Sequence, residues 1–357
     1  MNLPDGADLR KPEYRQEVFL RFYDYHTKHG THPGLVYLII PSLAKRFGWT
    51  TEETLWFSFL NGCTQHPVTS LRLWRVAPTL SEADRLTAWL EGNLPSVKVD
   101  TDRRYHRRLI PQAIAGYKKL LRGATQEDFW TSTTTQGWAE TWAAATAIPT
   151  FGRLSAWSFC DYLLCSGIAV SPTDLMLGDM AGSRSHRNGL AIISGRNDLD
   201  YHASNPSFNG KYTPEDLDFL ANTGDTLLQE AQTRSAGQPH AQFVNRLTLE
   251  SALCTYKSWH RPNRRYPNVY ADMMHDRLTA AQGVASDEDL AIFWDIRAEN
   301  LPPHLRLESN PGDPGVDPIK QNWYRETGRV PMMSHDYPDM DCELDDLIRY
   351  KSFGVFR

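Results

Sequence analysis

The sequence has few cysteines and no long apolar run. The longest purely apolar stretch near the N-terminus covers residues 34–40, far short of the ~20 residues that a membrane-spanning helix needs. The polar start, residues 1–10, has no apolar core of the kind found in a secretory signal. The five cysteines form no CxxC pair, which indicates reduced thiols and not a disulfide framework or a zinc site. These absences predict a cytoplasmic protein with no membrane partner.

Motifs for common nucleotide and metal chemistry are also missing. There is no GxxxxGK(S/T) phosphate loop, because the only Gly-Lys pair, Gly210–Lys211, is followed by Tyr212. No GxGxxG follows a predicted strand, and no HExxH or Cys/His set has metal-ligand spacing. ATP hydrolysis by a P-loop, hydride transfer on a Rossmann domain and zinc hydrolysis are therefore disfavoured, and no metal site is predicted.

Charge is segregated along the chain, although the net charge is only −5. Residues 101–122 contain seven basic side chains and one acid, Asp102, whereas acids gather in residues 336–346. Two further basic clusters are Lys257, Arg261, Arg264, Arg265 and Arg184, Arg187, Arg196; the interleaved aromatic residues are Tyr105, Tyr117, Trp259, Tyr266 and Tyr270. Each cluster alone is compatible with a solvated surface. Together they predict phosphate contact with base stacking, as in nucleic-acid binding.

Helical spacing and capping signals recur through the chain. Residues 13–29 place apolar side chains on one face, and residues 33–47 are apolar on most sides and end at Gly48. Thr50–Glu53 reads as a capping box before a helix over 55–60, which Gly62 is expected to stop. Further helices are predicted over 138–147 and 153–166, and further helix starts at Ser81, Thr125, Thr213 and Ser286.

Strictly alternating β-branched runs are nearly absent, which argues against a large sheet. Residues 301–317 are rich in proline and glycine and read as a long surface loop. The predicted fold is therefore mostly α, with residues 301–357 as an appended, loop-rich C-terminal segment that carries an acidic stretch.

Three polar stretches contain more hydrogen-bonding side chains than a core needs. Residues 61–70 offer Asn61, Gln65 and Thr69 as readers of a base edge, or else form a polar connection between helices. Residues 148–152, followed by Arg153, suit either phosphate binding at a helix start or plain turn chemistry. Residues 178–190 hold three glycines, two serines, two arginines and a histidine, which favours a flexible anion-binding or catalytic loop over a disordered linker.

Four stretches of the chain form a recognisable set. They are LWFSFLNGCTQHPVTS (55–70), FGRLSAWSFCDYL (151–163), GDMAGSRSHRNGL (178–190) and ESALCTYKSWHRPNRRYPNVYAD (250–272). Together they resemble the bacteriophage amino acid:DNA transferases, also called α-glutamyl/putrescinyl thymine pyrophosphorylases. The third and fourth stretches are the more specific, and the resemblance covers most of residues 11–301.

That family resembles helix-hairpin-helix DNA glycosylases, which implies a two-lobed helical region over residues 1–300 with a DNA cleft between the lobes. Residues 148–152 stand where the glycosylases carry a Leu-Pro-Gly-Val-Gly hairpin, with Thr150 in place of the first glycine. Asp174 lies 22 residues beyond Gly152, about where the catalytic aspartate of a glycosylase falls, and Asp179 is a competing candidate.

The resemblance also implies a reaction. The substrate is DNA in which a DNA-base kinase has already pyrophosphorylated 5-hydroxymethyluracil. The enzyme joins an amine, from a free amino acid or a polyamine, to the C5 methylene and releases pyrophosphate. The hypermodified thymine protects phage DNA from nucleases in the host cytoplasm. No cofactor is required, although Mg²⁺ could accompany the pyrophosphate.

This chemistry assigns roles to residues of the four stretches and to two residues outside them, Thr150 and Asp174. Departing pyrophosphate needs cations and the amine needs a base, so the candidate catalytic residues are Asp179, Asp174, Arg184, His186, Arg187 and Glu250. A flipped-out base would be read by Asn61, Gln65, Thr69 and Asn188. DNA contacts are predicted for Thr150, Phe151, Gly152, Arg153, Lys257, Arg261, Arg264, Arg265 and Tyr266. The alternatives are a helix-hairpin-helix glycosylase acting on modified pyrimidines and a non-catalytic DNA-binding protein.

Overall fold

The computed structural model describes residues 11–28, 35–100, 103, 106–180, 184–201, 211–260, 272–301 and 306. In these ranges the chain forms helices and no strand, which confirms the mostly α prediction. The α-helices are α1 (Pro12–Lys28), α2 (Leu35–Phe47), α3 (Thr51–Thr64), α4 (Pro67–Val76), α5 (Ala83–Asn93), α6 (Ile110–Leu121), α7 (Gln126–Gln136), α8 (Trp138–Ala147), α9 (Arg153–Cys165), α10 (Ser185–Ile193), α11 (Pro214–Ser235), α12 (Arg246–Tyr256), α13 (Met273–Ala281) and α14 (Asp287–Asn300). None of the helices in these ranges is long and apolar enough to cross a membrane. The predicted C-terminal segment, residues 301–357, lies outside the described residues apart from Leu301 and Arg306.

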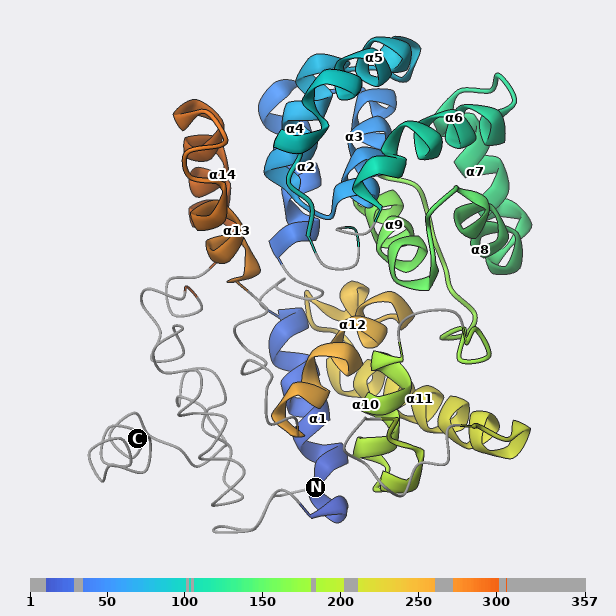
Figure 1. Cartoon of the computed structure of the whole chain (residues 1–357). Coiled ribbons are helices and arrows are strands. Elements are labelled where there is room, and N and C mark those ends of the chain that lie inside the picture. Colours follow the sequence, from blue (N-terminus) through green and yellow to red (C-terminus); the bar gives the residue numbers. More distant parts are fainter. Residues whose placement is uncertain are drawn as a thin grey trace.

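The helices fall into two groups (Figure 1). Helices α1, α10, α11 and α12 pack mainly on one another, and helices α2 to α9 form a second group. The pair α13 and α14 packs against α2 and α4 of the second group. The chain therefore begins in one group, builds the other, and returns to the first at α10. A DNA cleft between the groups stays a prediction.

Helix α1 joins its group through the apolar face predicted from its sequence. The side chains of that face are all buried: Val18, Phe19, Phe22 and Tyr23. The Phe19 ring meets the Tyr256 ring of α12 edge-on, with 5.3 Å between centroids, and the Tyr23 hydroxyl lies 2.7 Å from the Thr248 hydroxyl. Aromatic side chains bury much apolar area, and their polar ends find partners, so α1 is fixed against α12.

Most of the predicted helix starts are present. Thr50 Oγ1 accepts a hydrogen bond from the Glu53 backbone N–H at 3.3 Å, and Glu53 Oε2 accepts one from the Thr50 N–H at 2.8 Å, which completes the capping box. Thr125, Thr213 and Ser286 likewise cap α7, α11 and α14. The prediction for Ser81 is wrong, because Ser81 lies inside a short 3₁₀ turn, Leu80–Glu82, and α5 begins at Ala83.

The predicted stop at Gly62 is also wrong, since α3 continues to Thr64. Gly62 serves packing instead, because a Cβ there would lie 2.7 Å from the Phe151 ring. The helix ends at Gln65, whose φ of 50° is left-handed and whose N–H donates to the Asn61 carbonyl at 2.7 Å. Gly62 therefore allows close contact between α3 and the Phe151 ring, whereas the end of the helix lies three residues later, at Gln65.

Residues 185–193 form α10, so the flexible loop predicted over 178–190 is wrong for this part of it. His186 and Arg187 are fully buried. Gly189 lets α10 lie directly on α12, because a Cβ at this position would come within 2.5 Å of the Leu253 carbonyl oxygen. Three of the polar side chains that suggested a loop, those of His186, Arg187 and Asn188, are instead buried in the interior.

Gly189→Ala is expected to destabilise the protein by about 1–3 kcal/mol, because a backbone atom of α12 cannot move aside as a side chain can. Urea unfolding measures this loss. Gly178→Ala is the matched control, since a Cβ there would meet nothing within 4 Å. Equal losses in the two variants would contradict the role of close helix approach.

Candidate active site

Three helices, α9, α10 and α12, bring ionisable side chains together in the interior, and Figure 1 shows α9 of one group ending close to α12 of the other. Arg153 at the start of α9 donates through Nη1 to Glu250 Oε1 of α12 at 2.8 Å, and through Nη2 to the Leu175 carbonyl at 2.9 Å. Arg153 is 1% exposed and Glu250 is 4% exposed. Removing two charges from water is costly, so a buried ion pair that lies among further buried ionisable side chains marks this junction as the candidate active site.

His186 of α10 lies beside this ion pair. Its Nδ1 is 3.8 Å from Glu250 Oε1, beyond hydrogen-bond distance, and neither ring nitrogen has a hydrogen-bond partner among the described residues. Burial, and then the nearby cations Arg153, Arg187 and Lys257, hold the pKa of His186 well below its usual value. The imidazole is therefore neutral at neutral pH, and it is fully buried with both nitrogens unsatisfied in the described part of the chain.

Asp161 belongs to the same site, and the sequence analysis missed it. It lies two turns after Arg153 on the same face of α9, is 4% exposed, and its Oδ2 has no hydrogen-bond partner within the described part of the chain. Burial, and then the Glu250 carboxylate, raise the pKa of Asp161 well above its usual value. The signal was the spacing of Arg153, Trp157 and Asp161, which puts an acid on a buried helix face.

Arg187 holds the segment before α10. Its Nη1 donates to the carbonyls of Leu177 and Asp179, each at 2.8 Å, and its guanidinium carbon lies 5.5 Å from the Tyr212 ring centroid. Burial lowers the pKa of Arg187 from its usual value. Its Nε and Nη2 have no hydrogen-bond partner in the ranges described. The main chain of Asp179, not its carboxylate, is what Arg187 binds.

Arg184 and Asn188 both act on Tyr201. The Arg184 guanidinium stacks on the Tyr201 ring, 3.6 Å from its centroid. The Asn188 amide donates to the Tyr201 carbonyl at 2.8 Å and accepts from the Tyr201 N–H at 3.1 Å. The side-chain amide of Asn188, which was predicted to read a base, therefore uses both its nitrogen and its oxygen to bind the main chain of Tyr201. Arg184 keeps its guanidinium edge for other ligands.

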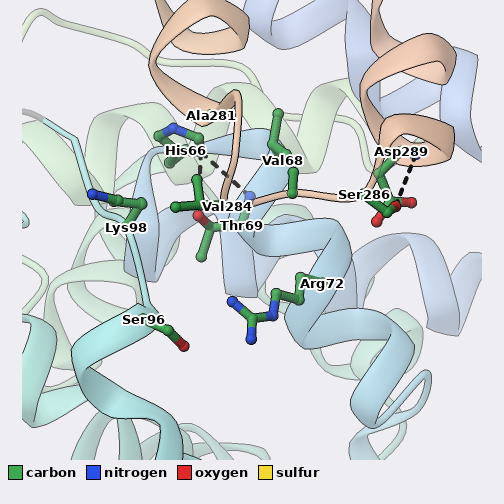
Figure 2. Close-up of a pocket in the computed structure, with 11 residues that line it drawn as sticks. His66, Val68, Thr69, Arg72, Ser96, Lys98, Ala281, Val284, Ser286 and Asp289 are labelled. Carbon is green, nitrogen blue, oxygen red and sulfur yellow. Dashed lines mark hydrogen bonds between the residues drawn. The ribbon is translucent and has the colours of Figure 1, made fainter.

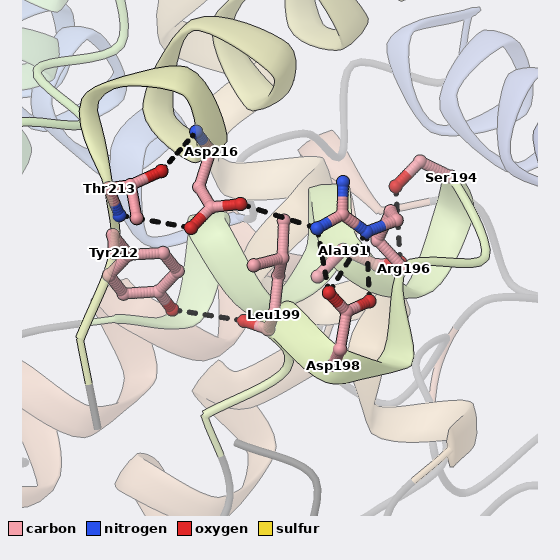
Figure 3. A network of polar contacts seen from close by, with 8 residues as sticks. All are labelled: Ala191, Ser194, Arg196, Asp198, Leu199, Tyr212, Thr213 and Asp216. Atoms are coloured by element: carbon pink, nitrogen blue, oxygen red, sulfur yellow. Dashed lines mark hydrogen bonds and ion pairs between the residues drawn. The ribbon is translucent and has the colours of Figure 1, made fainter. Parts of the chain in front are cut away.

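Two other polar residues near this region have structural partners. Asp174 is exposed and accepts a hydrogen bond from the Met176 N–H at 2.6 Å, which ties down its own turn. Arg196, grouped above with the basic residues, is paired with Asp198 at 2.6 Å and with Asp216 at 3.3 Å (Figure 3). Arg196 thus joins the turn after α10 to the start of α11.

The predicted base-reading side chains lie at the corner between α3 and α4. Asn61 is fully buried; its Oδ1 accepts from the Ser70 hydroxyl at 3.1 Å, and its Nδ2 has no partner among the described residues. The Thr69 hydroxyl lies 3.3 Å from His66 Nδ1. That these side chains face residues 178–188 across a cleft stays a prediction.

The helix-hairpin-helix element predicted over 148–152 is a turn between α8 and α9. Thr150 adopts a φ of 74°, the left-handed conformation that a glycine would take without strain. Arg103, which is 1% exposed, donates to Thr150 Oγ1 at 2.8 Å and to the Cys63 carbonyl at 2.9 Å, so it fixes the turn to the end of α3. Of the four residues predicted here to contact DNA, Thr150 and Gly152 reach the surface, whereas Phe151 and Arg153 are buried.

Of the remaining residues predicted to contact DNA, the structure describes one and not the other four. Lys257 is 9% exposed, its Nζ donates to the Cys254 carbonyl at 2.8 Å, and it is one of the cations that lower the pKa of His186. Arg261, Arg264, Arg265 and Tyr266 lie outside the described residues. Among the residues that the structure describes, no group of three or more His, Cys, Asp or Glu side chains is placed to hold a metal ion.

Comparisons with known proteins identify the family. A family model described as amino acid:DNA transferase matches residues 15–265 and so includes the whole candidate active site. The serinyltransferase of Salmonella phage ViI is 28% identical over 348 residues, which cover 92% of this chain and 84% of that protein. No solved structure matches the chain. Because the family model spans well over half of the sequence, the chain is a transferase that belongs to the amino acid:DNA transferase family.

Proposed function

We propose that this protein modifies phage DNA by joining an amino acid, through its α-amine, to the C5 methylene of pyrophosphorylated 5-hydroxymethyluracil. The observation that carries the proposal is the buried cluster of Arg153, Glu250, His186 and Arg187 in a chain of the amino acid:DNA transferase family. The similarity to a serinyltransferase favours an amino acid as donor; a polyamine is the second donor class that the chemistry admits. A DNA-base kinase would supply the activated base.

The proposed reaction is a substitution at carbon. The amine nitrogen donates its electron pair to the methylene carbon, and the carbon–oxygen bond to pyrophosphate breaks. Pyrophosphate leaves with that electron pair, and the new ammonium loses a proton to a base of the protein. A side chain of the protein cannot reach a nucleotide that is stacked in the duplex, so the modified nucleobase would be flipped out of the duplex.

His186 is the residue that we assign as proton acceptor. It is neutral, and its ring nitrogens have no partner among the described residues. A bound pyrophosphate would add negative charge beside the ring and so raise its basicity. Glu250, 3.8 Å away, would stabilise the imidazolium that forms.

Arg187 and Arg184 are assigned to the leaving group. Arg187 keeps two guanidinium nitrogens without partners among the described residues, and Arg184 begins the same helix. Guanidinium groups bind phosphate oxygens in pairs, and charge on these oxygens grows in the transition state. Arg187 is fully buried, so pyrophosphate would reach it only after the segment that it holds has moved. In this proposal Mg²⁺ would arrive with the pyrophosphate and not on a protein site.

The proposal is tested by mass spectrometry of nucleosides from DNA that contains pyrophosphorylated 5-hydroxymethyluracil, after incubation with the protein and single amino acids or polyamines. We expect a nucleoside that has lost pyrophosphate and gained one donor. Release of a free base would instead show a glycosylase, and unchanged DNA with every donor would refute transfer to this base. Fragmentation of the serine product decides between its amine and its hydroxyl as nucleophile.

A further inference from the structure

A cavity of about 240 Å³ lies outside the candidate active site, between α4 and the turn that joins α13 to α14 (Figure 2). Its polar walls are His66, Thr69, Arg72, Ser96, Lys98, Ser286 and Asp289. The α13–α14 wall follows the last residue that the family model matches. The cavity is therefore built jointly by the family region and by the helices that come after it.

The cations of this cavity are not neutralised. Neither Lys98 nor Arg72 makes an ion pair with another described residue. The Arg72 guanidinium stacks on the Trp89 ring, 5.1 Å from its centroid, and this contact leaves its charge without a counter-charge. The one acid in the wall, Asp289, is already paired with Arg75 at 2.7 Å. The cavity thus presents net positive charge to whatever enters it.

The other polar groups of the wall can all donate hydrogen bonds. His66 Nδ1 accepts from the Thr69 N–H at 3.3 Å, and burial, together with Arg277, lowers the pKa of His66 to about 4. The neutral ring therefore carries its proton on Nε2, which makes no hydrogen bond within the ranges described. The hydroxyls of Thr69, Ser96 and Ser286 complete the set, and Figure 2 shows Arg72 and Ser96 on facing walls.

A second cavity of about 330 Å³ shares His66 and Lys98 with the first. Its acid, Asp100, is held by Arg277 at 2.7 Å, so this neighbour also lacks a free carboxylate. The two cavities form one donor-rich region along the α3–α4 corner.

We propose that this region binds a phosphate of the DNA backbone and so anchors the substrate away from the reacting base. A phosphodiester is a compact acceptor, and arginine, lysine and hydroxyl donors are the groups that hold it. An amino acid fits poorly, because its ammonium would meet Arg72 and Lys98 with no free carboxylate to pair with. The proposal rests on the family's use of DNA, and not on the pyrophosphate chemistry proposed above.

The test measures binding of unmodified duplex DNA by fluorescence anisotropy over a range of salt concentrations. Arg72→Gln and Lys98→Gln should each weaken binding about tenfold at low salt and reduce the slope of log K against log salt by about one. Arg85→Gln on α5 is the control, since it removes the same charge from an exposed side chain paired with Glu82 at 3.2 Å. Lys98 is exposed and outside the helices, so its variant should fold as the parent does.

Isothermal titration with pyrophosphate distinguishes the two sources of phosphate. We expect the cavity variants to bind free pyrophosphate as the parent does. An unchanged salt slope in both variants overturns the proposal, and so does a loss of pyrophosphate binding with DNA affinity intact, which would assign the cavity to the product. Since unmodified DNA cannot react, neither result depends on whether the proposed transfer is correct.

Discussion

Glu250→Gln is expected to slow amino acid transfer by about 10²- to 10⁴-fold, the usual contribution of a positioned acid–base system. Glutamine keeps an oxygen for Arg153 but removes the charge that would stabilise a protonated His186, 3.8 Å away. DNA affinity should stay close to that of the parent, because Glu250 is buried. Single-turnover release of pyrophosphate measures the rate, and anisotropy on the same DNA measures binding.

Two variants separate chemistry from folding in this experiment. Glu299→Gln removes a carboxylate from an exposed arginine pair, with Arg46, and should leave the rate unchanged. Glu250→Gln also leaves the buried Arg153 without its counter-charge, whereas Arg153→Met combined with Glu250→Leu removes both charges and should recover stability. The double variant should nevertheless stay inactive. Full-rate transfer by Glu250→Gln would remove Glu250 and its partner His186 from the proposed mechanism.

Asp161→Asn is expected to stabilise the protein at neutral pH. Because the pKa of Asp161 is raised on folding, the native state binds a proton that the unfolded state has lost above about pH 4. Stability therefore falls as pH rises, by about 1.4 kcal/mol per pH unit, until the folded carboxyl ionises. Asparagine does not titrate, so the variant should escape this loss. Urea unfolding at pH 5, 6 and 7 measures the growing difference.

The contribution of His186 to stability changes with pH in the opposite direction to that of Asp161. It cancels from the comparison, because it is the same in the parent and in Asp161→Asn. Its pKa is lowered on folding, so its contribution is lost as pH falls below its ordinary value of about 6.5, in the parent and in the variant alike. Asp218→Asn, at an exposed position of α11, is the control and should show no pH-dependent gain. A difference between parent and Asp161→Asn that stays constant with pH would show that Asp161 ionises normally.

Local structure could be predicted from the sequence where it depends on residues that lie close together in the chain. The capping boxes at Thr50 and Thr213 and the apolar face of α1 depend on residues three or four apart, so each could be recognised without the rest of the chain. The mostly α fold followed from the same patterns. The family followed from four stretches, of which the third and fourth are the more specific because such strings rarely arise for packing reasons.

The candidate active site depended on contacts between distant parts of the chain. Arg153 was predicted to bind phosphate because it begins a helix, yet it pairs with Glu250, 97 residues later in the sequence. The stretch over 178–190 was predicted as a loop because it is polar, yet residues 185–193 form a helix whose polar side chains are buried. Asp161 was missed, because the spacing of Arg153, Trp157 and Asp161 was its only sequence signal, and its raised pKa comes from burial and from the neighbouring Glu250.

The sequence alone therefore determined the mostly α fold, most of the predicted helix starts and the family of this protein, because these rest on neighbouring residues or on short motifs. Only the tertiary structure decided which polar side chains meet water and which meet each other. Burial and neighbouring groups of like charge set the protonation of His186 and Asp161, and both causes are properties of packed helices and not of a position in the chain.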